Sequence, residues 1–179
     1  MHLTCATGVA ATQAVEEAHG AKPGIKWTND LVLGRQKLGG ILTEISVDPC
    51  TRKVAWAVIG IGINCCQQSK EAFAPEIREI ACSLDMPWQD TPALFVALIR
   101  QLHQMRWDLF DKQKEIMHAF RSKCVTLGKD ISILRGDAVR HGKAISVDDS
   151  GGLWVQYPDG STESVASGEV SIRGMYGYL

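Results

Sequence analysis

One segment, residues 26–44, constrains the fold of this chain more than any other. It contains the run Lys26-Trp27-Thr28-Asn29-Asp30, a short polar stretch, and then the run Lys37-Leu38-Gly39-Gly40-Ile41-Leu42-Thr43-Glu44. Glycine leaves the backbone accessible where a ligand must approach closely. Two lysines, an Asn and an Asp precede the glycine pair, and an apolar run follows it. The segment therefore predicts strands joined by a tight turn, with a site where a lysine ammonium meets an anion close to exposed backbone.

Apolar runs and turn residues predict three consecutive strands in the first third of the chain. We expect strands over residues 25–28, 40–47 and 54–63, with turns at residues 34–37 and 48–51. The third run is almost unbroken apolar, which predicts a central strand buried on both faces. Short connections between consecutive strands predict an antiparallel meander.

Helical patterns flank these strands. Residues 6–19 predict a helix that ends at Gly20, and residues 72–84 predict a short, irregular helical piece. A longer helix should begin with Thr91 as the N-cap and Pro92 in the first turn, and continue to residue 124 or 125 with a break near Asp111. Its core-facing stripe is Leu94, Leu98, Leu102, Met105 and Leu109.

The pattern changes after Gly128. Five short β-like runs, separated by turn residues, follow at 130–135, 138–147, 152–157, 162–165 and 169–173. We expect them to form a small closed barrel, because closure removes unpaired strand edges. The predicted fold is therefore α+β: residues 1–127 form an antiparallel or mixed sheet flanked by helices, and residues 128–179 form a small Src-homology-3-like β-barrel.

Composition narrows the class of protein. The chain has 179 residues, of which 45% are hydrophobic and 22% charged, as in ordinary globular proteins. The net charge of −1 gives no sign of nucleic-acid binding, and no apolar run is long enough for a membrane span. The first residues do not resemble a signal peptide. Six cysteines without C-x-x-C spacing predict reduced, mostly buried thiols. We expect a cytoplasmic protein without nucleic-acid or membrane partners.

The motifs resemble those of the biotin protein ligases, the biotin–acetyl-CoA-carboxylase ligase family. That family carries K-W-P-N-D, a short turn, and K-x-x-G-I-L-x-E; Thr28 stands here at the proline position. The run Gly60-Ile61-Gly62-Ile63-Asn64 resembles the family's G-x-G-I-N, and residues 168–173 resemble its G-E-[IV]-S-[LI]-R ending. The resemblance implies a catalytic domain like that of the class II aminoacyl-tRNA synthetases, followed by the barrel.

The resemblance also implies a reaction. Family members use ATP and Mg²⁺ to activate biotin to biotinyl-5′-AMP, and then transfer it to a lysine of a biotin carboxyl carrier protein domain. Lys37 would be the catalytic residue, since a fixed ammonium offsets the repulsion between a carboxylate and an α-phosphate. The implied biotin-binding residues are Lys37, Gly39, Gly40, Leu42, Gly60 and Ile61. The implied nucleotide-binding residues are Lys26, Asn29, Asp30, Asn64 and Arg173, with Asp30 also near magnesium, which takes few protein ligands.

The resemblance has a gap. The family's G-R-G-R-x-G-R loop, which covers biotin and holds phosphates, has no counterpart in these 179 residues, and neither does a helix-turn-helix. We therefore expect this chain to carry the later part of a catalytic domain and to be a poor ligase alone, whether it is a truncated gene product or needs a partner. Uncovered apolar faces and strand edges seek partners, so we expect self-association, as a two-fold dimer.

Other functions remain open at this point. The lipoate ligase group performs the same two-step chemistry on the same fold. A non-catalytic binding or assembly module is a second alternative, because the Gly/Arg-rich loop is missing. A dinucleotide-binding dehydrogenase is disfavoured, since Gly60-Ile61-Gly62 lacks a third glycine and no helix opens directly after it.

Overall fold

The computed structural model describes residues 2–67, 69–166 and 171–174. Helix α1 (His2–His19) precedes a four-stranded antiparallel sheet, whose strands lie in sequence order: β1 (Gly24–Lys26), β2 (Asp30–Leu33), β3 (Gln36–Val47) and β4 (Val54–Ile63). Two single 3₁₀ turns, η1 (Lys70–Ala72) and η2 (Trp88–Asp90), lead to α2 (Thr91–Asp111) and α3 (Gln113–Lys123). The antiparallel meander predicted from the sequence is confirmed, with β2 as an additional strand.

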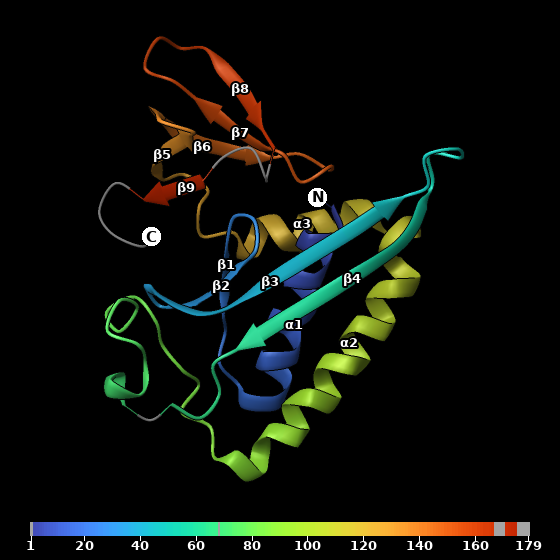
Figure 1. Ribbon diagram of the computed structural model, residues 1–179, viewed down its shortest axis with the longest axis vertical. Helices are drawn as coiled ribbons and strands as arrows, with labels where there is room; N and C mark the ends of the chain where they lie inside the picture. The colour runs from blue at the N-terminus through green and yellow to red at the C-terminus, as the bar shows by residue number, and fades with distance from the viewer. Residues whose placement is uncertain (1, 68, 167–170, 175–179) are drawn as a thin grey trace.

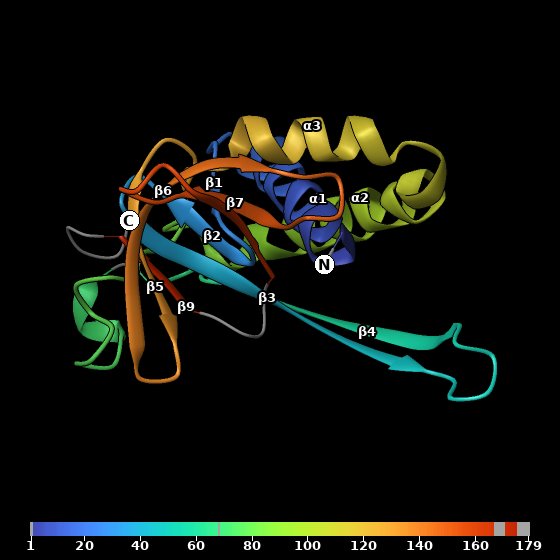
Figure 2. The same cartoon turned by 90° about the horizontal axis from the view of Figure 1, so that it is seen from above.

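The three helices lie on one side of this sheet (Figures 1 and 2). Helix α1 is the central element, because it packs against β3 and against both other helices. Small side chains dominate its buried surface, among them Ala6, Ala10, Ala11 and Ala14, and they allow the neighbouring elements to approach closely. On the sheet, Ile41 is buried, and Ile59, Ile61 and Ile63 pack against the same core.

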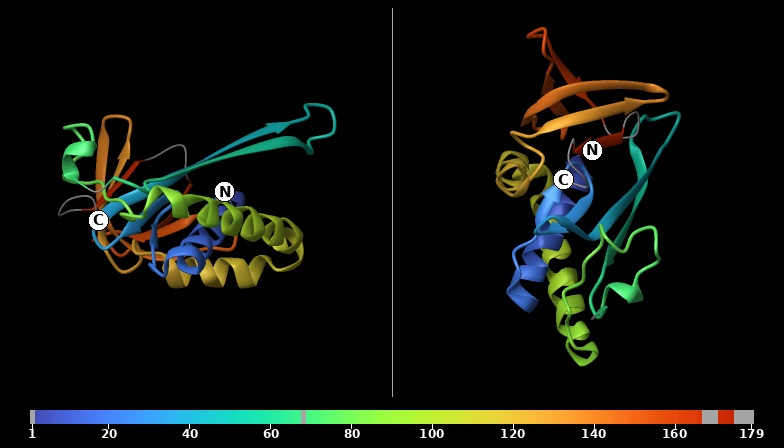
Figure 3. Two further views of the ribbon diagram at one scale, coloured as in Figure 1. Left: turned by 90° about the horizontal axis from the view of Figure 1, so that it is seen from below. Right: turned by 90° about the vertical axis from the view of Figure 1, so that its left-hand side faces the viewer.

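The prediction that residues 54–63 form a buried central strand is wrong. Strand β4 is the last in the sheet order, and its side chains are mostly exposed. With β3 it forms a hairpin that projects beyond the helices (Figure 2, and Figure 3, left). An unbroken apolar run indicates a strand, but it does not specify what covers that strand.

Several element boundaries also differ from the predictions. Residues 72–84 contain turns rather than a helix, apart from the end of the 3₁₀ turn at Lys70–Ala72. Thr91 is the first residue of α2 and not its N-cap, which is Asp90. The predicted break near Asp111 is confirmed, since Lys112 separates α2 from α3. The predicted core-facing stripe of α2 is also confirmed, because Leu94 and Met105 are buried and the leucines between them pack against the core.

The C-terminal strands form a second antiparallel sheet, ordered β8-β7-β6-β5-β9. Its strands are β5 (Asp130–Arg135), β6 (Ala138–Val147), β7 (Leu153–Gln156), β8 (Thr162–Val165) and β9 (Ser171–Gly174). All five predicted β-runs are present, although residues 169 and 170 of the last one lie outside the described residues. Among the described residues β8 and β9 are the two outer strands of this order, and no ladder joins them.

Side chains from the first part of the chain, among them Trp27 and Arg121 of α3, contact the second sheet near the turn between β6 and β7. The Trp27 indole Nε1–H donates to the Gly151 carbonyl at 2.9 Å, and Arg121 donates to the Val147 carbonyl at 2.9 Å and pairs with Asp149 at 3.0 Å. Trp27 is buried, whereas the Arg121 pair is partly exposed. The packing of the first sheet against the second therefore depends on a residue of the Lys26–Asp30 motif.

All six cysteines are free, but only Cys5 and Cys124 are buried, so the prediction of mostly buried thiols is wrong. Cys50 is exposed on the turn between β3 and β4, and the other three are half-buried. Among the described residues, no helix combines the length and the apolar character that crossing a membrane requires.

Candidate ligand site on the sheet face opposite the helices

The motif residues meet in one row across the first sheet. In the antiparallel register, Lys26 of β1 lies opposite Asp30 of β2, Asp30 lies opposite Gly40 of β3, and Gly40 lies opposite Gly62 of β4. Residues that oppose each other in an antiparallel pair share one face of the sheet. Because the neighbouring residues Ile41, Ile61 and Ile63 pack on the helical side, this row lies on the opposite face.

Lys37 and Asp30 form an ion pair in this row. The Lys37 Nζ lies 2.5 Å from Asp30 Oδ1, and the side chains are 39% and 19% exposed. The backbone of Lys37 is fixed from the other side, because its N–H donates to the Ile80 carbonyl at 2.6 Å and its carbonyl accepts from the Cys82 N–H at 2.8 Å. Hydrogen bonds therefore fix the backbone of Lys37, and Asp30 holds its ammonium, which remains in contact with solvent.

Glycines leave the space beside this ion pair open. A Cβ placed on Gly40 would lie 3.5 Å from Asp30 Oδ1 and 3.7 Å from Lys37 Nζ. A Cβ on Gly62 would have no neighbour within 4 Å, and one on Gly60 would meet only Leu42, at 3.8 Å or more. Leu42 opposes Gly60 and is exposed. The result is a shallow apolar surface, made of backbone and one leucine, that ends at a lysine–aspartate pair.

Gly39 and Ile61 do not belong to that surface. A Cβ on Gly39 would clash with the backbone carbonyl of Gly62, so glycine is required there for β3 and β4 to pair. Ile61 lies between the two glycines of β4 and packs against the core on the helical side. Of the six predicted biotin-binding residues, the structure thus brings together Lys37, Gly40, Leu42 and Gly60, and gives the other two a packing role.

The two predicted asparagines hold the loops around the site. The Asn29 amide donates to the Ile41 carbonyl at 2.9 Å, and the Ile41 N–H donates back to the Asn29 carbonyl at 2.8 Å. The Asn64 amide donates to the Cys82 carbonyl at 2.9 Å. Arg173 lies in β9, opposite Ser132 of β5. Residues 168–170 of the same motif lie outside the described residues.

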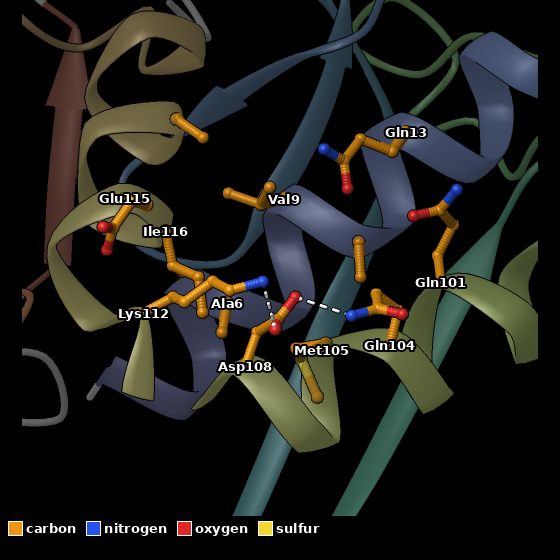
Figure 4. A pocket seen from close by; sticks show the side chains of 12 residues that line it. Ala6, Val9, Gln13, Gln101, Gln104, Met105, Asp108, Lys112, Glu115 and Ile116 are labelled. Atoms are coloured by element: carbon orange, nitrogen blue, oxygen red, sulfur yellow. Dashed lines mark hydrogen bonds and ion pairs between the residues drawn. The ribbon is translucent and has the colours of Figure 1, made fainter. Parts of the chain in front are cut away.

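The sequence did not predict the hollows near the helices. A cavity of about 560 Å³ adjoins the end of β4, next to Asn64, and includes Ile63, Cys65, Trp88 and Phe95. A smaller one of about 190 Å³ lies between the three helices (Figure 4). There Asp108 pairs with Lys112 at 2.8 Å, and the hydrogen bond from Lys112 lowers the pKa of the Asp108 carboxyl. In the sequence, helical periodicity indicated only which of the side chains lining these cavities face the core and which face solvent.

The described residues do not hold a metal centre of their own, since no group of three or more His, Cys, Asp or Glu side chains converges among them. Asp30 is the one predicted metal-binding residue, and its carboxylate already contacts Lys37. Magnesium is often bound by one or two carboxylates together with substrate phosphates. Asp30 fits that mode of binding, in which phosphate oxygens complete the shell.

Comparison with known proteins identifies the family. A profile of the "Biotin/lipoate A/B protein ligase family" matches residues 1–64, and one of the "Biotin protein ligase C terminal domain" matches residues 126–173. This chain belongs to the biotin protein ligase family. The first match contains every predicted site residue except Arg173, which is the last residue of the second match.

Relatives cover nearly all of this chain. The Bacillus subtilis "Bifunctional ligase/repressor BirA" is 30% identical over 167 residues, which are 88% of this chain and 49% of that protein. The Mycobacterium tuberculosis "Biotin--[acetyl-CoA-carboxylase] ligase" is 26% identical over 172 residues, 94% of this chain and 61% of that protein. The chain therefore spans about half to three-fifths of the length of these ligases.

Solved structures support the same fold. The "Biotin protein ligase from Aquifex aeolicus in complex with biotin and ATP" matches with a TM-score of 0.78 and 26% identity, over 97% of this chain and 72% of that one. A second structure of the Aquifex aeolicus ligase matches with a TM-score of 0.80 and 25% identity. The α+β fold predicted from the sequence is thereby confirmed.

Proposed function

We propose that the sheet face opposite the helices binds biotin and the nucleotide of an ATP-dependent biotin protein ligase. One observation carries this proposal: the Lys37–Asp30 ion pair lies beside Gly40 and Gly62, whose missing side chains leave that face open. Similarity to an Aquifex aeolicus ligase in complex with biotin and ATP supports it. Because this chain spans about half of its Bacillus subtilis relative, the activity is proposed for a complete ligase site to which this chain contributes.

The contact between Lys37 and Asp30 explains how the site would select an anion. Without ligand, the Asp30 carboxylate balances the Lys37 ammonium at 2.5 Å. A biotin carboxylate arriving over Gly40 would meet the same ammonium, because the Cβ position of Gly40 is 3.7 Å from the Lys37 Nζ. Two unit charges at about 4 Å interact by roughly 4 kcal/mol near a protein surface. Repulsion from the Asp30 carboxylate reduces that attraction, and the remainder would help to orient a carboxylate whose apolar tail rests on Leu42 and Gly60.

The proposed reaction has two steps. In the first, a biotin carboxylate oxygen attacks the α-phosphorus of ATP and pyrophosphate leaves, which forms biotinyl-5′-AMP. Lys37 would stabilise the negative charge that accumulates on the α-phosphate oxygens during this step. In the second, the amine of a lysine on a carboxyl carrier protein domain attacks the acyl carbon, and AMP leaves. Magnesium bound to ATP would neutralise phosphate charge, with Asp30 as the carboxylate that reaches it.

The residues proposed to bind the nucleotide lie at both ends of the row. Lys26 lies in the same row as Asp30, and Asn64 lies just beyond Gly62. Arg173 completes the proposed set. The cytoplasmic location expected from the sequence is part of the same proposal.

Two alternatives compete with this proposal. The family profile over residues 1–64 covers lipoate as well as biotin ligases, so lipoate is the competing substrate. The second alternative is a binding or assembly module that does not make adenylate by itself.

Isothermal titration with biotin, lipoate and biotinyl-adenylate tests the proposal. We expect biotinyl-adenylate to bind more tightly than biotin, lipoate to bind weakly, and the Lys37→Ala variant to lose affinity for the adenylate. The Lys53→Ala variant is the matched control, because Lys53 is an exposed lysine at the far end of the hairpin. A folded protein that binds none of the three ligands would overturn the proposal, and a preference for lipoate would replace the substrate.

A further inference from the structure

Two adjacent cysteines follow the candidate ligand site directly. Cys65 and Cys66 come after Asn64, where the chain leaves β4, and Cys66 lies at a bend. Both are half-buried free thiols, and both border the cavity of about 560 Å³ that also includes Trp88 and Phe95. The other cysteines, at positions 5, 50, 82 and 124, have no neighbouring cysteine in the sequence. The pair therefore combines two thiols with a hollow through which a small reagent can reach them.

The two thiols differ in their surroundings. The Cys65 thiol donates to the Ile63 carbonyl at 3.4 Å, and burial, together with the neighbouring Cys66, raises its pKa. The Cys66 thiol has no hydrogen-bond partner among the residues that the structure describes. The thiolate is the reactive form of cysteine, and a raised pKa makes it scarcer. Cys66 is therefore the thiol that should react first, with Cys65 beside it as a second thiol.

The segment that precedes η2 joins this pair to Lys37. The N–H groups of Leu84 and Met86 donate to the carbonyls of Asn64 and Cys65, at 3.0 and 2.8 Å respectively. A few residues earlier, the same segment holds the backbone of Lys37 through the two hydrogen bonds described above. A change of backbone conformation at Cys65 would therefore reach the segment on which the position of Lys37 depends.

We propose that Cys65 and Cys66 are a modification site, at which a small disulfide is reduced and the two thiols are joined to each other. In the first step the Cys66 thiolate attacks one sulfur of the reagent, which forms a mixed disulfide and releases one small thiol. In the second step the Cys65 thiolate attacks the Cys66 sulfur, and the second small thiol leaves. The cysteines lose two electrons and two protons, and the reagent accepts them as two thiols.

Geometry makes this disulfide easy to reverse. Consecutive Cα atoms are about 3.8 Å apart across a trans peptide, whereas the Cα atoms of most disulfides are about 4.4–6.8 Å apart. A bond between adjacent cysteines is thus strained, and strained disulfides are the labile ones. Closing the ring also constrains the backbone of both residues, including the Cys65 carbonyl that accepts from Met86. We expect oxidation to loosen that segment and reduction to restore it.

The charges near the cavity favour a cationic reagent. None of the described residues that border the cavity is charged. Asp85 immediately precedes Met86, Asp90 immediately precedes Thr91 at the cavity, and both aspartates are exposed. Carboxylates attract cations and repel anions, and salt screens both effects. The dication cystamine should therefore react faster than the anionic glutathione disulfide, and the difference should shrink as salt is added.

Intact-mass measurement after incubation with cystamine tests the site. The Cys50→Ser protein is the parent, because this change removes the exposed lone thiol. We expect the parent to lose the mass of two hydrogen atoms, and the peptide with both cysteines to resist alkylation until it is reduced. Adding Cys65→Ser should leave a stable mixed disulfide on Cys66, since the displacing thiol is gone. Adding Cys82→Ser is the matched control, because Cys82 is also half-buried but has no adjacent cysteine, and it should behave as the parent does.

Amide hydrogen exchange tests the link to Lys37. In the oxidised parent, exchange at Leu84 and Met86 should accelerate by about tenfold or more, as expected when a local hydrogen bond is lost, and dithiothreitol should reverse the change. Affinity for biotinyl-adenylate should fall by about tenfold on oxidation and recover on reduction. This last consequence rests on the proposed function, whereas the modification itself does not. Circular dichroism checks that each variant remains folded.

The possible outcomes separate the parts of this proposal. A folded parent that forms no internal disulfide, or a Cys65→Ser protein that also loses two hydrogen atoms, would overturn the modification site. Unchanged exchange at Leu84 and Met86 after oxidation would overturn the link to Lys37, and a faster reaction with glutathione disulfide would overturn the preference for cations. An oxidised protein with the expected exchange, whose reduced form binds neither biotin nor adenylate, would count against the proposed function alone.

Discussion

Asp30 and Gly40 lie directly opposite each other on β2 and β3, and the Cβ that Gly40 lacks would lie 3.5 Å from the Asp30 carboxylate. This relationship brings the two halves of the sequence motif together. The Lys26–Asp30 run supplies a carboxylate, and the Lys37–Gly40 run supplies an ammonium and an open backbone at the same place. The register of one hairpin therefore creates the charged end of the candidate site.

Replacing Lys37 by alanine tests the charged end. In a ligase form that makes adenylate, Lys37→Ala should slow pyrophosphate release by an amount equivalent to about 3–4 kcal/mol of transition-state stabilisation, as for other preorganised electrostatic contacts. Stability should change little, because the ion pair with Asp30 is partly exposed and contributes at most about 1 kcal/mol. Retention of most of the wild-type rate would remove Lys37 from the catalytic assignment.

The neighbouring glycines should respond differently to a side chain. Gly40→Val should block ligand binding and leave the protein folded, because its Cβ meets Asp30 and Lys37 only at ordinary contact distances. Gly39→Ala should instead destabilise the fold by about 2–4 kcal/mol, since its Cβ meets the backbone of Gly62. Urea denaturation and titration with biotinyl-adenylate separate the two effects. Equal loss of stability in both variants would show that Gly40 is merely a packing glycine.

The order of the helices and strands could be predicted from the sequence, but the elements that cover each strand could not. Apolar spacing located α1, the meander and all five C-terminal β-runs, because those patterns depend on local conformation. It failed for β4, whose apolar run is the same whether a strand is buried or forms an edge. The short strand Asp30–Leu33 was missed because its first residue belongs to a turn-like Asn-Asp pair.

The site was predicted at the level of the motif but not of individual side chains. The structure brings Lys37, Asp30 and Gly40 together, and the ligand-binding roles that the resemblance implied for them stay predictions. Gly39 and Gly40 look equivalent in sequence, and only the register with Gly62 shows that one is required for packing and the other leaves a surface open. The adjoining Trp88 and Phe95 carried no signal beyond ordinary hydrophobicity.

Thiol reactivity should follow burial. Cys50 should react first with a disulfide reagent, whereas burial raises the pKa of the Cys5 thiol to about 12 and raises that of Cys124 as well.

The two buried thiols, Cys5 and Cys124, should also make stability depend on pH. In the unfolded chain they ionise near pH 9, so the unfolded state releases protons first and gains stability from that pH upward. We therefore expect the free energy of unfolding to fall between about pH 9 and 12. Cys5→Ala should reduce that decline, and rapid modification of Cys5 in the folded protein would contradict this account.

The contact between the two sheets gives the last test. Trp27→Phe keeps most of the buried ring but removes the Nε1–H that donates to the Gly151 carbonyl at 2.9 Å. Because that carbonyl belongs to a buried residue, we expect a loss of about 1–3 kcal/mol in the free energy of unfolding. Trp154→Phe is the matched control: its Nε1–H donates to Asp148 at 3.2 Å, but Trp154 is 38% exposed whereas Trp27 is 5% exposed, so the control should lose less than about 0.5 kcal/mol. Calorimetry should also show the two sheets unfolding less cooperatively in Trp27→Phe. Equal effects in the two variants would mean that the Trp27 hydrogen bond does not hold the sheets together, and that the Arg121 contacts or apolar packing do so instead.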